Sequence, residues 1–193
     1  MNTAKNELIS SIIYSPHVEN NFRSFTTPLA NGTLFSIRSL DIRTDLPVIH
    51  TWVNMPYAIP FWRMNISPEE LEKSCRSAME LPFAHTFVGC LYGQPYCQVD
   101  IYDPSCDTIG EYYPVEKGDL GMHLLIGPGK KPVRHFSLQI VLPFLGFLFQ
   151  SAVLVQTTWI CVILPGAMPK FCRILKPMVL IQIRILQQAM ILL

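Results

Sequence analysis

The sequence predicts an α+β protein. Runs typical of strands and helices follow one another as strand, helix, helix, antiparallel strands, glycine-rich loop and helix, not as a repeated β–α unit. The chain has 193 residues, half of them hydrophobic, which is enough for one domain with a substantial core. We divide it into an N-terminal polar segment (residues 1–32), a folded domain (33–162) and an apolar tail (163–193).

The first predicted elements are a strand and a helix. The polar segment ends at Asn31-Gly32, a good turn signal. "TLFSIRSLD" then alternates apolar and polar residues, which predicts a strand. "DIRTDLPVIHTWVN" predicts a short helix with Thr44 or Asp45 as its N-cap and Pro47 in its first turn.

The stretch "ISPEELEKSCRSAMEL" has the clearest helix pattern in the chain. Ser67 is a natural N-cap, Pro68 takes the first helical position, and two glutamates follow in the positively polarised first turn. Leu71, Cys75 and Met79 fall on one face of this helix, so we expect them to pack together.

The second half of the domain begins with a predicted hairpin. Two strand-like runs in "HTFVGCLYGQPYCQVDIYD" flank a turn at Gly93-Gln94-Pro95. A third strand, His123–Ile126, precedes a loop rich in glycine and lysine. A helix from about Ser137 to Gln150 and a strand around "ICV" follow.

Composition excludes several classes of protein. The first 136 residues hold 11 Lys/Arg and all 14 acids (net −3), and the last 57 hold four bases and no acid (net +4). Four bases spread through an apolar tail form no nucleic-acid stripe, although the tail allows membrane contact. The cysteines show no C-x-x-C spacing, and the N-terminus has no apolar signal-peptide core, so we expect a cytoplasmic protein with buried thiols and no metal site.

The loop after the third strand has the features of a pyrophosphate site. Gly127 and Gly129 let the backbone approach a ligand, and the start of a helix follows. Lys130, Lys131 and Arg134 add positive charge. A basic surface loop with no ligand would have the same composition, and this alternative stays open.

Several motifs together resemble one family. "HTFVGCLYGQPYCQVDIYD", "IGEYYPVEKGDLGMHLLIGP" and the upstream "HTWVNMPYAIPFW" are similar to the siderophore-biosynthesis acyltransferases of the GNAT superfamily. The likeness covers roughly residues 34–150 and is strongest in the enzymes that acylate N-hydroxylysine, N-hydroxyputrescine or N-hydroxycadaverine (the aerobactin, alcaligin and rhizobactin type). It is weaker to the lysine N-acyltransferase of mycobactin assembly. It implies a GNAT-like fold, a mixed central sheet flanked by helices.

The most specific element is Gly118-Asp119-x-Gly121-x-His123-Leu124-Leu125-Ile126-Gly127. The resemblance implies that His123 is the catalytic base, since a neutral imidazole accepts a proton near pH 7. It implies that Asp100 points toward substrate and that Asp119 fixes a turn. The loop from Gly127 to His135 becomes the coenzyme loop, although its bases depart from the superfamily's Arg/Gln-x-x-Gly-x-Gly/Ala form.

Three aromatic residues are candidates for an amine pocket. Trp52, Phe61 and Trp62 match the family's aromatic segment, so the resemblance implies that they bind substrate. Aromatic residues near the first helices of a domain are often plain core, and that alternative stays open.

The tail departs from the family. Relatives continue with a Glu-Pro-Asp-x-Arg-Asn segment, whose acid partners the histidine, and then Gly-Phe; here "ILPGAMPKF" follows the strand. Because Met has one codon, a one-base shift forces Ala at Met168-Pro169, Gly at Met178-Val179 and Asp at Met190-Ile191. The shifted frame also permits Trp-Arg-Asn and Phe at the family's spacing. We therefore interpret the tail as frameshifted just after Val162. A membrane segment in the uncharged stretch 137–169 is the rival interpretation.

These observations lead to one prediction of function. The chain is expected to transfer an acyl group from acetyl-CoA or succinyl-CoA to an N-hydroxylated diamine or lysine in hydroxamate siderophore biosynthesis. Its expected partners are this small-molecule amine or hydroxylamine and the acyl-CoA. The alternatives are an inactive remnant whose tail prevents folding or activity, and a membrane-associated protein that is not an enzyme.

Overall fold

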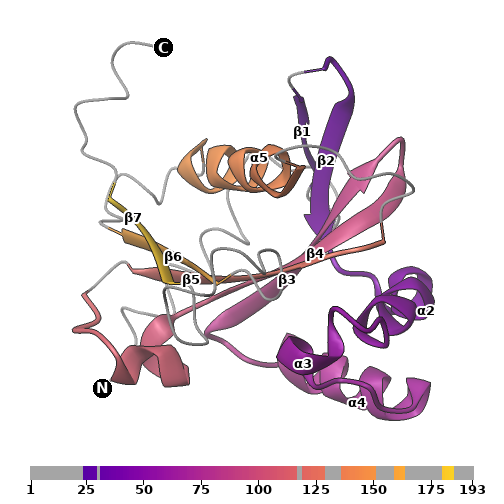
Figure 1. Cartoon of the computed structure of the whole chain (residues 1–193), viewed down its shortest axis with the longest axis horizontal. Helices are drawn as coiled ribbons and strands as arrows, with labels where there is room; N and C mark the ends of the chain where they lie inside the picture. The colour runs from indigo at the N-terminus through magenta and orange to yellow at the C-terminus, as the bar shows by residue number, and fades with distance from the viewer. Residues whose placement is uncertain are drawn as a thin grey trace.

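A computed structural model describes residues 24–29, 31–116, 119–128, 136–150, 159–163 and 180–184 (Figure 1). The strands are β1 (Ser24–Pro28), β2 (Leu34–Ser39), β3 (Ala84–Leu91), β4 (Gln94–Tyr102), β5 (Leu120–Ile126), β6 (Trp159–Ile163) and β7 (Leu180–Arg184). The helices are α2 (Ile42–Val53), α3 (Ile59–Trp62), α4 (Pro68–Met79) and α5 (Phe136–Gln150), with short 3₁₀ turns η1 (Pro104–Cys106) and η2 (Thr108–Glu111).

One seven-stranded sheet runs through the molecule in the order of the sequence, β1 to β7. Neighbouring strands are antiparallel except β5 and β6, which are parallel. A parallel pair needs a crossover connection, and α5 lies in that connection. The prediction of an α+β fold with a mixed sheet flanked by helices is therefore confirmed.

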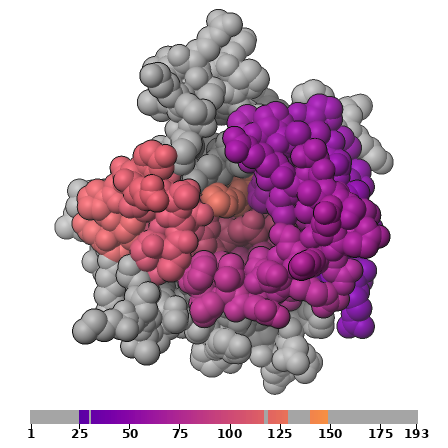
Figure 2. Space-filling model, turned by 90° about the horizontal axis from the view of Figure 1, so that it is seen from below, coloured from indigo at the N-terminus to yellow at the C-terminus, as the bar shows by residue number. Residues whose placement is uncertain are grey.

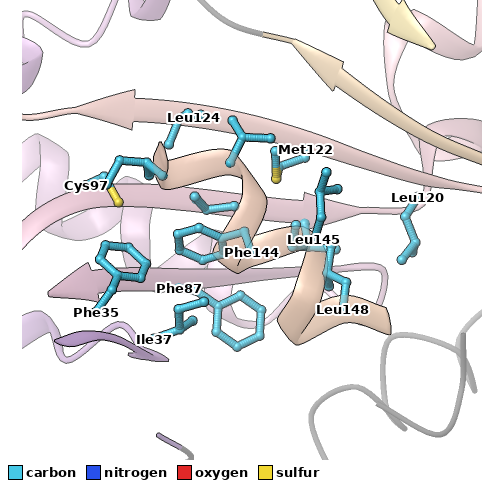
Figure 3. Close-up of a cluster of buried hydrophobic side chains, with 14 of the residues drawn as sticks. Phe35, Ile37, Phe87, Cys97, Leu120, Met122, Leu124, Phe144, Leu145 and Leu148 are labelled. Carbon is cyan, nitrogen blue, oxygen red and sulfur yellow. The ribbon is translucent and has the colours of Figure 1, made fainter. Parts of the chain in front are cut away.

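Helices cover the two faces of the sheet, α5 on one and α2, α3 and α4 on the other (Figure 1). Alternate residues of each strand point to opposite faces, and one set of apolar strand residues meets α5. Figure 3 shows this cluster, in which Phe144, Leu145 and Leu148 of α5 pack on side chains from four strands. Those strand residues include Phe35, Ile37, Phe87, Cys97, Leu120, Met122 and Leu124. The α5 face is thus wholly apolar at its centre.

The opposite face has a second core beneath α2 and α4. Ile49 and Trp52 of α2 and Leu71 of α4 pack there on Val88 of β3 and Leu125 of β5. This cluster ends where β4 and β5 present polar side chains. The candidate site lies at that boundary.

The helix after β2 begins earlier than predicted. Asp41 is its N-cap and accepts a hydrogen bond from Arg43 N at 3.0 Å, so the proposals of Thr44 or Asp45 as the cap were wrong. Asp45 is instead buried and accepts hydrogen bonds from the two terminal guanidinium nitrogens of Arg38, at 2.6 and 2.7 Å. Pro47 accordingly lies inside the helix and not in its first turn.

The helix predicted from Ser67 onward is confirmed as α4, with a capping box between Ser67 and Glu70. Its apolar face is shorter than expected. Leu71 is buried and Cys75 is partly buried, but Met79 is 51% exposed because it lies in the last turn, past the edge of the core.

The sheet differs from the prediction at its first strand and at the hairpin. β1 pairs with β2 through Phe25↔Ile37, so the sheet reaches into the segment set apart as polar. The hairpin turn is Tyr92-Gly93, one residue earlier than predicted. Both residues have positive φ (51° and 73°), as a two-residue hairpin of the mirror-image type requires.

The predicted strand around "ICV" is confirmed as β6, and β7 in the tail pairs with it antiparallel. The predicted helix from about Ser137 is confirmed as α5. Of the helices in the described ranges, none combines the length and apolar character that crossing a bilayer needs.

Candidate active site

Three polar residues form a row across the sheet on the face opposite α5. Thr86 of β3 pairs in register with Asp100 of β4, and Asp100 pairs with His123 of β5. Directly opposite residues on neighbouring antiparallel strands place their Cβ atoms about 4.5–5.5 Å apart. The register therefore brings the predicted base and the predicted substrate-facing acid together, although they are far apart in sequence.

Two donors hold the Asp100 carboxylate. Thr86 Oγ1 donates to Asp100 Oδ1 at 2.7 Å. Gln98, two residues earlier on the same face of β4, donates from Nε2 to both carboxylate oxygens at 3.1 and 3.3 Å. These contacts fix the carboxylate beside the histidine.

His123 lies between two aromatic rings. Its Nε2 is 2.9 Å from the hydroxyl oxygen of Tyr102, and the two ring centroids are 4.5 Å apart. The Trp62 ring meets the imidazole edge-on, at 6.4 Å between centroids and 78° between planes. The histidine side chain is only partly buried, so a substrate has access to it.

The electrostatics of the row follow from burial. Burial lowers the pKa of His123 from its usual value of 6.5, and attraction to Asp100 and Asp107 opposes this. Loss of water around the carboxyl raises the pKa of Asp100, and the hydrogen bonds from Thr86 and Gln98 oppose that shift. The imidazole is therefore neutral near pH 7, the state that a general base needs.

Cys75 of α4 is close enough to Asp100 to feel its charge, but it is no nucleophile. Burial, with some repulsion from Asp100, raises the pKa of its thiol to about 11. The thiol stays protonated at neutral pH, and only the thiolate attacks. The site thus supports direct transfer to an external acceptor better than a covalent enzyme intermediate.

Trp62 and Phe61 lie on α3, at the edge of this face. The indole Nε1 of Trp62 is buried and, among the described residues, has no hydrogen-bond partner. Phe61 is 47% exposed. Figure 2 looks onto this face and shows a hollow between the purple α2–α3 segment and the salmon segment around β5. The sheet face that carries His123 therefore has both a hollow and, next to the imidazole, an indole with an unpaired N–H.

Trp52 has a different environment from the other predicted aromatic residues. It is 4% exposed, and a Cβ added at Gly127 would lie 2.5 Å from its ring. Gly127 N–H donates to the carbonyl of Tyr96 at 2.9 Å, and Tyr57 donates its hydroxyl to the carbonyl of Ile126 at 2.8 Å. Trp52 is therefore a core residue that positions the start of the predicted coenzyme loop.

The rest of that loop, with Gly129, Lys130, Lys131 and Arg134, lies outside the described residues. Asp119 accepts a hydrogen bond from Glu116 N at 2.9 Å, so it fixes the turn before β5. Within the part of the chain that the structure describes, no group of His, Cys, Asp and Glu side chains is arranged to hold a metal ion.

Sequence reasoning missed Tyr102, Thr86 and Gln98. The available signal was the alternation along β4, which puts residues 98, 100 and 102 on one face. The pairing with Thr86 depends on the register of β3 and β4, where a bulge at Gly89/Cys90 shifts the alignment. No local pattern fixes that register.

Comparison with known proteins decides the family. The family described as an acetyltransferase (GNAT) domain matches residues 41–162, more than half of the chain. The chain belongs to the GNAT acetyltransferase family. The resemblance stated from the sequence motifs is thereby confirmed, and the mixed sheet with its histidine row is a GNAT sheet.

The curated relatives are named for acyl transfer to N-hydroxylated amines or to lysine. The chain is 27% identical to an N-hydroxyputrescine acetyltransferase of Acinetobacter baumannii, over 60% of this chain and 55% of the relative. It is 23% identical to the lysine N-acyltransferase MbtK of a Mycobacterium species (48% and 38%) and 29% identical to an N(6)-hydroxylysine O-acetyltransferase of Escherichia coli (49% and 30%). The chain thus spans about a third to just over half of the length of these relatives.

Solved GNAT structures share the fold. An uncharacterized protein from Bacillus halodurans superposes with a TM-score of 0.68 at 25% identity, over 78% of this chain and 76% of that one. The aminoglycoside acetyltransferase AAC(6')-Ib in complex with coenzyme A and kanamycin has a TM-score of 0.57 at 17% identity, over 72% and 78%. The second likeness concerns the fold alone.

Proposed function

We propose that this chain transfers an acyl group from an acyl-CoA thioester to the nitrogen of an N-hydroxylated diamine or lysine, a step of hydroxamate siderophore assembly. The observation that carries the proposal is His123, a partly buried, neutral imidazole beside Asp100 on the hollowed face of a GNAT sheet. The activities for which the curated relatives are named narrow the class of acceptor to N-hydroxylated amines and lysine.

The proposed reaction needs a base and a leaving group. The acceptor nitrogen attacks the thioester carbonyl carbon, a C–N bond forms and the C–S bond breaks. His123 takes the proton that the nitrogen loses, and the departing coenzyme A thiolate gains one. Asp100 lies close enough to favour the imidazolium that forms during the transfer.

The unpaired N–H of Trp62 supports recognition of the hydroxyl on the acceptor nitrogen. A buried donor without a partner is costly, so a bound ligand with an acceptor oxygen at this position is favoured. An amine that lacks the oxygen leaves the donor unpaired, at a cost of about 1–3 kcal/mol. We therefore expect a preference of about 10-fold to 100-fold for the hydroxylated amine.

The acyl donor in this proposal is acetyl-CoA or succinyl-CoA, held by the loop that follows β5. Trp52 and the Tyr96 carbonyl fix the first residue of that loop, Gly127, against the sheet. Because the donor is a metabolite of the cell interior, we place the protein in the cytoplasm.

The test is an acyl-transfer assay with the purified chain. Acetyl-CoA or succinyl-CoA is mixed with N-hydroxyputrescine, N-hydroxylysine, lysine or putrescine, and released thiol and product mass are measured. We expect thiol release with an N-hydroxylated acceptor and far less with putrescine, the matched control. If none of these acceptors causes thiol release, the proposal is refuted.

The absence of Asp and Glu from residues 137–193 favours one competing proposal, an inactive remnant. Family members carry the acid that partners the histidine in that part of the chain. The same assay separates the two proposals, because a remnant binds no acceptor productively and gives no acylated product.

A further inference from the structure

Tyr102 makes the closest polar contact to the candidate base. Its hydroxyl oxygen lies 2.9 Å from His123 Nε2, and its ring lies 4.5 Å from the imidazole between centroids. Tyr102 is 5% exposed. Gly121, the register partner of Tyr102 on β5, makes room for the ring, since a Cβ at Gly121 would collide with it. The tyrosine is therefore held against the histidine by the sheet itself.

The two nitrogens of His123 have different surroundings. Nε2 is hydrogen-bonded to the hydroxyl of Tyr102, whereas Nδ1 makes no hydrogen bond to any residue that the structure describes. A substrate proton must reach an unoccupied nitrogen, which is Nδ1. In the neutral ring one nitrogen carries hydrogen and the other accepts. A base that works through Nδ1 therefore carries its hydrogen on Nε2 and donates it to Tyr102 Oη.

We propose that Tyr102 is a positioning residue that holds His123 in the Nε2–H tautomer and so makes Nδ1 the base. The partner of one imidazole nitrogen generally sets the proton on the other. When Nδ1 takes the proton of the attacking amine, the C–N bond forms, the C–S bond breaks and the thiolate gains a proton. The hydrogen bond from Nε2–H to the Tyr102 hydroxyl oxygen stays in place throughout. This inference rests on the proposed acyl transfer.

Other groups that face His123 do not replace Tyr102. Asp100 makes hydrogen bonds to Thr86 and Gln98 and, among the described residues, none to His123. Asp107, at the start of η2, and Asp100 act on the imidazole through charge. Trp62 meets it edge-on at 6.4 Å. Tyr102 alone in this set contacts a ring nitrogen at hydrogen-bond distance.

Tyr102→Phe tests the proposal because it keeps the ring over Gly121 and removes only the hydroxyl. Two measurements are made on the full chain. With acyl-CoA and N-hydroxyputrescine, we expect kcat to fall by about 10-fold or more, less than the loss of the base itself, with the KM for acyl-CoA unchanged. A purely structural role would instead lower stability and leave the kcat of the folded fraction unchanged.

The second measurement needs no activity. Two-dimensional ¹⁵N–¹³C spectra of labelled histidine, with His123 assigned from the His123→Ala spectrum, report the tautomer directly. In the wild type above the pKa of His123 we expect a protonated Nε2 and an unprotonated Nδ1. In Tyr102→Phe we expect a mixture of tautomers. Tyr92→Phe, which removes an exposed tyrosine hydroxyl at the hairpin turn, is the control and leaves both readouts unchanged.

The possible failures are distinguishable. If the wild type and His123→Ala both release no thiol, the proposed function fails, while the spectra still decide the tautomer. If the wild type is active and Tyr102→Phe keeps its kcat, Tyr102 does not position the base. A wild-type spectrum with protonated Nδ1 overturns the inference whatever the activity.

Discussion

Burial shifts the pKa values of the two residues at the centre of the candidate site. Removing water lowers the pKa of His123 and raises that of Asp100, so both shifts favour the uncharged forms. If His123 is the base, as we propose, its neutral form is the active one. A lowered pKa therefore extends the pH range in which the base is ready to accept a proton. The attraction to Asp100 limits how far this shift goes.

The sign of this shift predicts the pH profile. Activity needs neutral His123, so kcat/KM is lost as the pH falls through the pKa of the folded enzyme, which lies below 6.5. Asp100→Asn removes the attraction that raises the His123 pKa, and the acidic limb moves to lower pH. The measurement is a kcat/KM profile of both proteins. Glu111→Gln, an exposed acid in η2, is the control and leaves the limb in place.

Removing the base gives a direct prediction for turnover. His123→Ala is expected to lower kcat by about 10²–10⁴-fold, the usual range for a positioned base. Acyl-CoA affinity changes little, because the predicted coenzyme loop follows β5 and does not include this side chain. Steady-state rates and acyl-CoA titration check the two parts. An equal loss of affinity and turnover would mean that His123 binds the donor and is not the base.

At this scale the sequence allowed part of the site to be predicted. His123 and Asp100 have chemistry that draws notice, and a family motif surrounds the histidine. Tyr102 has no such mark, because a tyrosine on a strand is typical of a core. Its role depends on Gly121 and on the β4–β5 register, which are properties of the folded sheet.

At the scale of the elements, the end of β5 and helix α2 act together. Trp52 lies against Gly127, and Tyr57 holds the carbonyl of Ile126. The aromatic residues of the α2–α3 segment thus have different contacts. Trp52 and Tyr57 support the start of the loop after β5, and the Trp62 ring lies edge-on to the His123 imidazole. A side chain at Gly127 has no room without a shift of the Trp52 ring.

The loop after β5 is proposed to bind the pyrophosphate of the acyl-CoA, which predicts a charge effect. Lys130→Glu with Lys131→Glu should weaken acyl-CoA binding and reduce its dependence on salt, because two attractive charges become repulsive. Arg43→Glu with Lys73→Glu makes the same change of net charge on exposed helix positions. Titration at two ionic strengths compares the variants. Unchanged affinity in the loop variant would identify the loop as an ordinary basic surface.

Elements whose start is marked by neighbouring residues in the sequence were predicted well. The capping box and proline at the start of α4 are read within four residues. The hairpin turn was misplaced because Gly93-Gln94-Pro95 contains strong turn residues, yet the turn needs positive φ at Tyr92 and Gly93. β1 was missed because its residues are polar, and only Phe25 packs on the core. Pairing with β2 determines this strand.

At the scale of the whole molecule, the two faces of the sheet have different tasks. The α5 face is an apolar core, and the α2–α4 face is apolar under the helices and polar along the Thr86–Asp100–His123 row. We therefore expect substitutions on the first face to act through stability and substitutions in the proposed catalytic row to act on turnover. This separation lets rates and stability be measured as independent quantities.

Acidic residues are distributed unevenly along the chain, and all 14 lie within the first 136 residues. No Asp or Glu occurs from residue 137 to residue 193. The family resemblance implies an acid there that partners the histidine. We propose that a one-base shift after Val162 produced this tail.

The gene sequence tests this shift. One base inserted after the Val162 codon should open a frame that encodes an acid-Pro-x-Trp-Arg-Asn-like segment followed by Gly-Phe. The restored chain should turn over faster than the 193-residue chain, because it regains an acid to orient His123. Stop codons in that frame before the Gly-Phe position would rule the shift out and identify the apolar tail as native.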